Sequence, residues 1–256
     1  MRDNKPLGDF LRSRRQRLDP AALGIVSARR RRTPGLRREE IAERAGISCE
    51  WYVKLEQGRK VSASHETIAA LARALILDAG ETAHLRKLAA RGAAPAFVRE
   101  IVPDIIRNIV HGLPEPAYVT GERWDTLCWN ASADRLFGFS AMAEADRNIL
   151  YYMLTSPAAR DLFGESWADE AQRMIALFRV AYDQRRGDRL FEELVSALVT
   201  ASADFGRWWS SYQVATPSSG RKTLRLKGQT ATAFDYATFQ ANDDPALKLA
   251  LYTRVS

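Results

Sequence analysis

The chain has 256 residues and a formal net charge of +7. Its length favours two ordinary domains, because domains commonly run to about 100 to 200 residues. The charge is uneven: residues 1–92 contain 20 Lys and Arg against 11 Asp and Glu, and residues 93–256 contain 18 against 20. A basic half joined to a near-neutral half indicates that the first half binds a polyanion. The alternative is a basic domain that is merely soluble.

Composition also argues against several protein classes. The opening MRDNKPLGDF carries charges where a secretory signal needs an apolar core, and no uncharged apolar run approaches the ~18 residues of a membrane span. We therefore expect a cytoplasmic protein. Cys49 and Cys128 are far apart and in no C-x-x-C spacing, so neither a disulfide framework nor a metal site is predicted. No cofactor is expected.

Five short amphipathic helices are predicted in the first half. Their apolar residues recur at helical spacing over residues 7–18, 36–45, 48–57, 65–78 and 79–91, with a loop or arm over 19–35. Ser64 can cap the fourth helix, and Gly58 can end the third. Gly92 and Pro95 mark the natural boundary. The sequence therefore predicts a domain over residues 1–92, with a helix-turn-helix core at about 36–83.

The second half has a mixed pattern. An apolar stripe at Phe97, Ile101, Ile105, Ile109 and Leu113 predicts a connecting helix over 93–112. Two short strands follow within residues 117–129, then a helix capped at position 130 or 132 and a helical stretch over 145–205. Alternation around residues 227–228 and again over 247–255 predicts three closing strands. We expect an α+β domain over 113–256 whose antiparallel sheet of about five strands is covered by helices.

The segment ERAGISCEWYVKLEQG has the features of a DNA-reading helix pair. A tight turn through Gly46 and Ile47 can set the steep crossing angle of the two helices, while Ser48 caps the second helix. Ile41, Tyr52 and Leu55 would fasten the pair to the domain. Side chains in the first turn of the second helix, and one turn later on the same side, point into the major groove. The predicted base-reading residues are Cys49, Glu50 and Lys54.

These residues differ in what they offer a base. Lys54 can donate to guanine O6 and N7, Glu50 can accept from a cytosine N4 amine, and Cys49 offers a weak donor or an apolar contact. The alternative for Glu50 is an ion pair with Lys54 at i, i+4 on a solvated face. Contacts to phosphates fix the position of a protein on DNA without reading the base sequence. The residues predicted to make them are Arg37, Arg38, Ser48, Arg59 and Lys60. A basic arm of Arg29, Arg30, Arg31 and Arg32 would add phosphate or minor-groove contacts, or would remain a solvated arm.

The segment RREEIAERAGISCEWYVKLEQGR resembles the Cro/cI-type, or XRE, helix-turn-helix of bacterial regulators, and LEQG is its most specific part. PAYVTGERWDTLCWNASADRLFG, FGRWW, GRK, DYATF and DDPALKLALYT follow in the order found in regulators with an MmyB-like ligand-binding domain. This resemblance implies a dimeric transcription regulator whose second domain has a PAS-like fold and binds a small, apolar molecule. It covers nearly the whole chain.

A ligand pocket in the second domain would be lined by apolar and aromatic side chains. The candidates are Trp124, Trp129, Leu136, Phe137, Tyr151, Met153, Phe178, Trp208 and Tyr236. For each one taken alone, the alternative is an ordinary core position. A nucleophile elbow, a phosphate loop, a dinucleotide fingerprint and H-E-x-x-H are all absent from the sequence, so no enzyme is predicted. The second domain would instead serve as a ligand sensor, or as a protein-interaction or dimerisation module without a small-molecule ligand.

Overall fold

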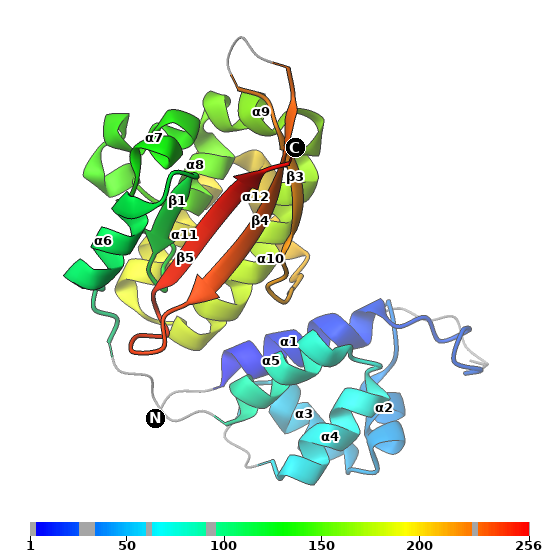
Figure 1. Ribbon diagram of the computed structural model, residues 1–256. Coiled ribbons are helices and arrows are strands. Elements are labelled where there is room, and N and C mark those ends of the chain that lie inside the picture. Colours follow the sequence, from blue (N-terminus) through cyan, green and yellow to red (C-terminus); the bar gives the residue numbers. More distant parts are fainter. Residues whose placement is uncertain (1–3, 26–33, 60–62, 91–95, 227–229, 256) are drawn as a thin grey trace. The chain divides into compact units, whose positions relative to one another are not determined.

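The chain divides between residues 95 and 96. The computed structural model describes residues 4–25, 34–59, 63–90, 96–226 and 230–255, and Met1–Pro95 and Ala96–Ser256 form separate units within it (Figure 1). We describe each unit by itself. Among the described residues, no helix combines the length and the apolar character needed to cross a membrane.

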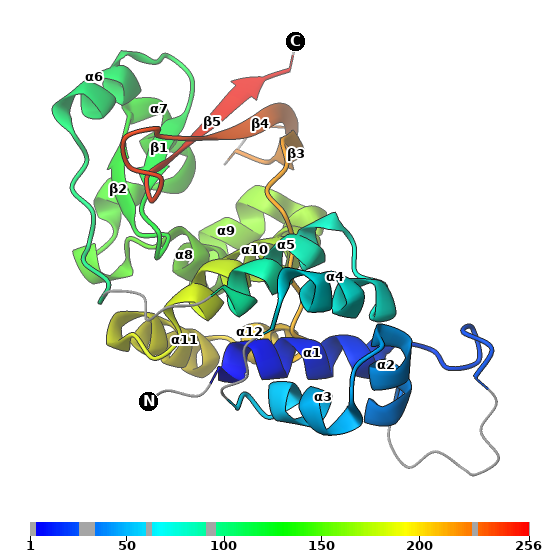
Figure 2. The ribbon, with the colours of Figure 1, turned by 90° about the horizontal axis from the view of Figure 1, so that it is seen from below.

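The first unit is built from helices α1 (Lys5–Arg17), α2 (Arg38–Ala45), α3 (Cys49–Glu56), α4 (His65–Ala74) and α5 (Ala79–Ala89). Helix α1 packs against α3 and α5, and α2 packs against α3 and α4 (Figure 2). Side-chain caps start three of the helices: Ser48 for α3, Ser64 for α4 and Asp78 for α5. The five predicted helices are confirmed, and their core contains Phe10, Leu36, Ile41, Tyr52, Leu55 and Leu71.

The second unit contains one antiparallel sheet of five strands. Its members are β1 (Ala117–Thr120), β2 (Thr126–Trp129), β3 (Gly220–Leu224), β4 (Thr232–Gln240) and β5 (Lys248–Arg254), in the order β2-β1-β5-β4-β3. The closing strand β5 therefore lies between the opening hairpin and β4, with Val119 opposite Leu249 and Tyr236 opposite Tyr252. The predicted antiparallel sheet of an α+β domain is confirmed. The predicted turn at residues 227–228 lies outside the described residues.

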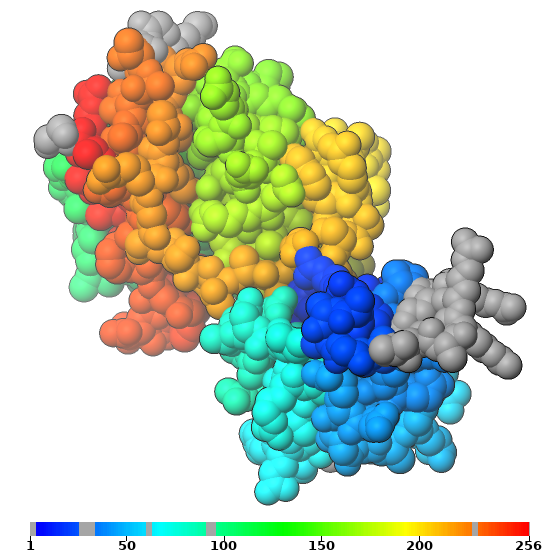
Figure 3. Space-filling model, turned by 90° about the vertical axis from the view of Figure 1, so that its right-hand side faces the viewer, coloured from blue at the N-terminus to red at the C-terminus, as the bar shows by residue number. Residues whose placement is uncertain are grey.

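A helical layer covers one face of this sheet. Its helices are α7 (Ala131–Phe137), α8 (Ile149–Thr155), α9 (Pro157–Phe163), α10 (Trp167–Arg185), α11 (Arg189–Ala201) and α12 (Ala203–Ser210), with three short 3-10 turns between α7 and α10. Figure 3 shows the orange strands β3 and β4 beside the green and yellow helices, and α9 packs against β3. Strand residues that point to this side, such as Tyr118, Phe234 and Tyr252, join the main apolar core.

The other face of the sheet meets helix α6 (Asp104–Gly112), where the structure corrects the sequence analysis. The connecting helix predicted over 93–112 begins only at Asp104, and residues 96–103 are not helical. Pro103 is the N-cap, so α6 begins directly after it. Val102, Ile106 and Val110 pack in the core under α6, whereas Ile101, Ile105 and Ile109 of the predicted stripe are exposed.

Candidate functional site

The turn between α2 and α3 has the geometry that a DNA-reading helix pair requires. Gly46 adopts the left-handed conformation with φ of 66°, which suits glycine because it lacks a Cβ. Ser48 then caps α3, its hydroxyl accepting a hydrogen bond from the Trp51 amide at 3.2 Å. Ile41, Tyr52 and Leu55 are almost fully buried, as predicted. The two helices are therefore held together by their inner sides.

The outer side of α3 carries the three predicted base-reading residues. Glu50 is exposed, and Cys49 and Lys54 are half-buried. The Lys54 ammonium lies 2.8 Å from the Glu50 carboxylate, and the hydrogen bond and the charge of Lys54 together lower the pKa of Glu50. The i, i+4 pair considered for Glu50 is thus present in the structure. Both side chains remain largely accessible, at 42% for Lys54 and 80% for Glu50, so both can exchange partners.

The predicted phosphate-binding residues fall into different environments. Arg37 and Arg59 are exposed at the two ends of the helix pair. Arg38 is half-buried, and its guanidinium donates to Glu56 at 2.9 Å, so it also has a structural role. Lys60 and the arm residues Arg29 to Arg32 lie outside the described residues. The DNA roles of all these residues remain predictions.

Glu56, the acidic residue of LEQG, is the buried centre of the first unit. Its carboxylate accepts hydrogen bonds from Arg15 at 2.7 and 2.8 Å and from Arg38 at 2.9 Å, and its side chain is 1% exposed. Arg15 also donates to the Leu36 carbonyl at 2.7 Å. Burial alone would raise the pKa of Glu56, but Arg15 and then Arg38 more than offset that effect, and the net pKa is lowered. This carboxylate joins α1, α2 and α3.

The glycine of LEQG has a related role. Gly58 adopts a φ of 72°, and its carbonyl accepts a hydrogen bond from the Asn4 amide at 2.6 Å. Gly8 in α1 comes so close to the end of α3 that a Cβ there would lie 2.5 Å from the Glu56 carbonyl oxygen. The sequence analysis used LEQG only as a resemblance and missed these contacts. Glu56 bonds Arg15 and Arg38, which lie 41 and 18 residues away in sequence.

All nine predicted pocket residues belong to one apolar cluster of the second unit. Phe137, Met153 and Phe178 are buried in it. The other six are partly buried and pack against it: Trp124, Trp129, Leu136, Tyr151, Trp208 and Tyr236. The rings of Trp124 and Phe178 meet at 5.8 Å, and Phe178 stacks on Phe191 at 6.0 Å. The structure thus brings the predicted residues together, while their contact with a ligand remains a prediction.

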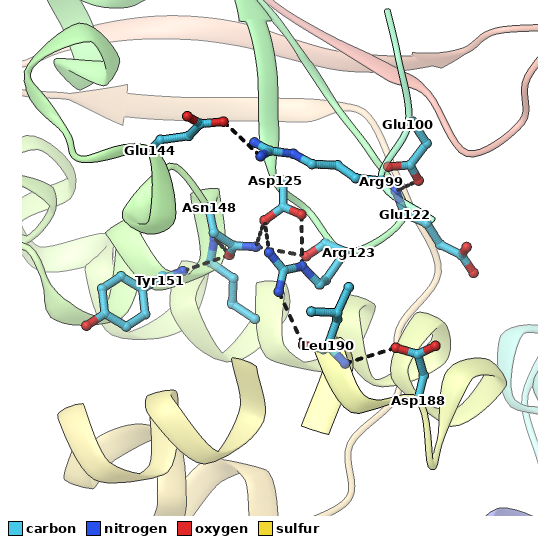
Figure 4. Close-up of polar contacts among 11 residues, drawn as sticks. Arg99, Glu100, Glu122, Arg123, Asp125, Glu144, Asn148, Tyr151, Asp188 and Leu190 are labelled. Carbon is cyan, nitrogen blue, oxygen red and sulfur yellow. Dashed lines mark hydrogen bonds and ion pairs between the residues drawn. The ribbon is translucent and has the colours of Figure 1, made fainter. Parts of the chain in front are cut away.

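A polar network surrounds the turn that carries Trp124, and Figure 4 shows Arg123, Asp125 and Asn148 of this network. Arg123 forms a bidentate pair with Asp125, both bonds being 2.8 Å, and also donates to the Leu190 carbonyl. Asn148 donates to the Arg123 carbonyl at 2.8 Å and to Asp125 at 3.2 Å. Trp124, between the two paired residues, has a φ of 70°, which an L-residue adopts at a cost in strain. The network therefore holds Trp124 in a conformation that turns it toward Phe178.

A charged group that the sequence analysis missed lies within the same core. Lys222 on β3 places its ammonium 2.7 Å from Glu170 on α10 and 3.8 Å from the centre of the Tyr236 ring, and it is 10% exposed. Burial lowers the pKa of Lys222 to about 8, and Glu170 offsets this only in part. Glu170 also pairs with Arg173 at 2.6 Å. Alternation in GRKTL could have identified Lys222, because it points to the same side of β3 as buried Leu224.

The non-helical segment 96–103, which we call the strap, is attached to the same part of the unit. The Phe97 amide donates to Asp188 at 2.8 Å, and the Phe97 ring meets Phe191 edge-on at 5.2 Å. Glu100 accepts from the Glu122 amide at 2.7 Å in the turn that carries Trp124. Burial, with the charges of Glu122 and Asp125, raises the pKa of Glu100 although backbone hydrogen bonds oppose it. Figure 4 shows Glu100 beside this turn, and Arg99 pairing with Glu144.

The titratable groups of the two units were compared for possible clusters. Among the described residues, no group of three or more His, Cys, Asp or Glu could hold a metal ion. Two of the perturbed groups form buried ion pairs, Glu56 with Arg15 and Arg38, and Lys222 with Glu170. A third, Glu100, accepts a hydrogen bond from the Glu122 backbone amide. The two regions therefore offer an exposed helix face in the first unit and an aromatic core in the second.

Comparison with known families agrees with this division. A family model described as MmyB-like transcription regulator ligand binding domain matches residues 102–255, more than half of the chain. A second, described as Helix-turn-helix domain, matches residues 6–85. A search of curated proteins gave no match. The chain therefore belongs to the family with an MmyB-like transcription regulator ligand-binding domain, and its helix-turn-helix domain makes it a DNA-binding transcription regulator.

Proposed function

We propose that this regulator is a homodimer that reads a specific operator through α3 and changes its operator affinity when a small apolar molecule binds the second domain. The observation that carries the proposal is the placement of α3. Its inner side is locked by Tyr52, Leu55 and Glu56, while Cys49, Glu50 and Lys54 stay accessible on the outer side. A rigid helix with an accessible polar side is what the major groove accommodates.

Reading a base requires Lys54 to leave Glu50. An exposed ion pair of this kind is weak, because water solvates both partners. A good contact from lysine to guanine is worth about 1 to 3 kcal/mol of discrimination. The base contact therefore wins where the operator presents guanine. Elsewhere Lys54 stays with Glu50, and the surrounding arginines supply affinity without preference.

A dimer places two copies of α3 in successive major grooves, about 34 to 36 Å apart on a near-palindromic operator. This mechanism needs no catalytic step. The arginines outside α3 set the dependence on salt, since each phosphate contact releases counterions. Arg37 and Arg59 are the described residues best suited to this role, because both are exposed.

For the ligand response, the strap supports a direct connection to the sensor core. A molecule that wedges apart Trp124 and Phe178 would also move Phe191, which contacts Phe97 two residues after the boundary between the units. Coupling of about 1 to 3 kcal/mol is enough to change operator occupancy 5- to 150-fold, and it must act in both directions. Ligand and operator then alter each other's affinity.

One observation favours a second candidate for the C-terminal domain. Helix α6 exposes two isoleucines, Ile105 and Ile109, a pattern typical of a protein-interaction or dimerisation surface. If binding a partner at this surface is the whole role of the domain, it works without a small molecule. Native mass spectrometry of the purified protein, before and after denaturation, separates the candidates: a released compound supports the sensor. Absence of any bound compound, together with no melting shift on adding apolar extract, supports the interaction module.

The test of DNA reading is operator selection with the whole protein, with and without cell extract. We expect Lys54→Ala to relax the preference at one base position. Arg59→Ala should weaken binding to all sequences alike and reduce the salt dependence by about one unit. Arg59→Ala is the matched control because its side chain is exposed and lies outside α3. An unchanged preferred operator with Lys54→Ala would contradict the assignment of the reading side.

A further inference from the structure

The side of α6 that faces away from the sheet carries two exposed isoleucines, Ile105 and Ile109, beside exposed Asp104 and Asn108. Val98, Ile101, Ile105 and Ile109 are exposed by 78%, 85%, 70% and 53%, and we call these four residues the isoleucine face. Across the helix, Ile106 and Val110 pack toward the sheet. Large apolar side chains that gather on a surface commonly mark a site where a partner binds. None of the described residues of the second unit covers the isoleucine face.

This surface has a neighbour on the same side of the sheet. Phe239 on β4 is 55% exposed. It lies directly opposite Leu249, which packs against the core under α6, and directly opposite residues in an antiparallel pair point to the same side. Side chains of this size present roughly 100 to 200 Å² when fully accessible. The exposed fractions of these five residues therefore give about 500 Å² per copy. Two copies would bury about 1,000 Å² in total, which is below a standard interface but at the lower limit for a specific one.

The other described residues of the chain offer no matching surface. Over the parts of the first unit that the structure describes, Ile76 is the single large apolar side chain that is exposed. In the second unit, Val199 on α11 is exposed but stands alone. An apolar face needs an apolar partner of similar size, because burial of its surface drives the contact. Among the described surfaces, the isoleucine face of a second copy supplies one.

We propose that the isoleucine face is the surface through which two copies of this chain pair around a two-fold axis. The inference rests on the proposed homodimer and names its interface. In a two-fold contact each patch meets its own copy, so α6 would lie antiparallel to α6 of the second copy, with Ile105 of one chain beside Ile109 of the other. This arrangement also sets the N-terminal end of each helix dipole beside the C-terminal end of the other.

The same strap that enters the sensor core contributes to this interface. Phe97 points into the core at 7% exposure, while the next residue, Val98, is 78% exposed on the isoleucine face. Val102 is buried next to exposed Ile101. A shift of the strap in response to the core therefore changes the surface that the second copy contacts. The interface and the sensor share one short segment.

Two charge substitutions test the interface without disturbing α6 itself. Ile105→Asp puts a negative charge in the first turn, and Ile109→Lys puts a positive charge in the last turn, so both complement the helix dipole. Circular dichroism should show each variant folded. Val199→Asp is the matched control, because it places a charge at an exposed apolar position on another helix, α11.

Analytical ultracentrifugation of the full chain gives the readout. Wild type and Val199→Asp should sediment at twice the chain mass of 28.7 kDa at micromolar concentration. Ile105→Asp and Ile109→Lys should each raise the dimer dissociation constant at least about 10-fold, since each change occurs twice in the interface. Mixing the two variants should restore a dimer, because Asp at 105 then faces Lys at 109 and the isoleucines face each other.

The outcomes separate this inference from the function it rests on. A wild type that stays a monomer, also on its operator, overturns the homodimer and the interface together. A dimeric wild type whose two variants remain dimeric overturns the interface alone. Dissociation of Val199→Asp as well would show a general effect of charge and overturn the assignment. If each variant alone loses the dimer and the mixture of the two regains it, the antiparallel pairing is supported.

Discussion

Replacing Glu56 by Gln removes the charge that two arginines share while it keeps the shape of the side chain. Arg15 would then keep its hydrogen bond to the Leu36 carbonyl but would lose its buried counter-ion, with 7% of its side chain exposed. Breaking a buried ion pair from one side costs about 3 to 5 kcal/mol, because it leaves an uncompensated buried charge. Gln can still accept one hydrogen bond, so we expect about 3 kcal/mol for Glu56→Gln.

That loss is large for a unit of this size. At about 0.05 to 0.15 kcal/mol per residue, the first unit has a stability of roughly 5 to 14 kcal/mol. A loss of about 3 kcal/mol lowers the melting temperature of such a unit by about 12 to 24 °C. Hydrogen exchange of the full chain in increasing urea, followed on peptides from α1 to α5, measures the change in this unit. Peptides from α8 to α12 serve as an internal reference.

Glu50→Gln is the matched control, since it removes the same charge from an exposed position on the same helix. It should leave the exchange of the first unit unchanged. The stability of the first unit at acid pH gives a second check. The pKa of Glu56 is lowered in the folded state, so the stabilisation by this carboxylate is present above its ordinary pKa of 4.5. That stabilisation is lost as pH falls through the pKa that Glu56 has in the folded state. The two proteins should therefore converge in stability at acid pH. A loss below about 0.5 kcal/mol for Glu56→Gln would refute the reasoning.

Three further predictions concern other contacts. Gly8→Ala should destabilise the first unit, seen in the same hydrogen-exchange assay, because the added Cβ would lie 2.5 Å from the Glu56 carbonyl oxygen; an unchanged unit would mean that α1 and α3 can separate freely. Lys222 has a pKa of about 8, below its ordinary 10.5, so the unfolded chain binds more protons between these values and the stability of the second unit should rise with pH there. Lys222→Met should lack this rise in urea titrations, and an equal slope in both proteins would contradict the assignment. Glu100→Gln should raise the melting temperature of the second unit at pH 7 and lose this advantage near pH 4, because the raised pKa of Glu100 means that its charged form is disfavoured in the folded state; a gap that widens toward acid pH would rule this out.

The parts that could be predicted from the sequence are those fixed by neighbours along the chain. Gly46 and Ser48 mark a turn and a cap through local backbone chemistry, and both act as predicted. The strands were predicted from the alternation of apolar and polar residues. The helix cap at Asn130 was predicted from the ability of its side chain to accept a backbone hydrogen bond. The apolar residues predicted to line a pocket in the second domain do lie together, Phe137 and Phe178 among them, while their contact with a ligand stays a prediction. Local signals were therefore sufficient for element type and order.

The parts that could not be predicted depend on partners that are distant in sequence, or on which side of a helix the fold covers. Glu56 and Lys222 owe their roles to residues 41 and 52 positions away, which only the fold brings near. Trp124 adopts its positive φ because Asn148 and Asp125 over-determine its turn. Of the apolar stripe predicted around α6, Ile101, Ile105 and Ile109 are exposed, and the helix begins only after Pro103. Periodicity gives the spacing of apolar residues along a helix but not which of its sides the fold covers.

The strap links the aromatic core of the second unit to the isoleucine face. Its inward residue, Phe97, meets Phe191 in the aromatic core, and its outward neighbours, Val98 and Ile101, are exposed on the side that we assign to the second copy. The Phe97 amide donates to Asp188, and Glu100 accepts from the Glu122 amide, so a movement of the core or of its turn can be passed to the strap. Small changes at a packed core are carried onward because such cores shift between discrete arrangements. A ligand that alters the core would therefore act first on the spacing of the two chains, which is the quantity that operator binding by a dimer depends on most directly.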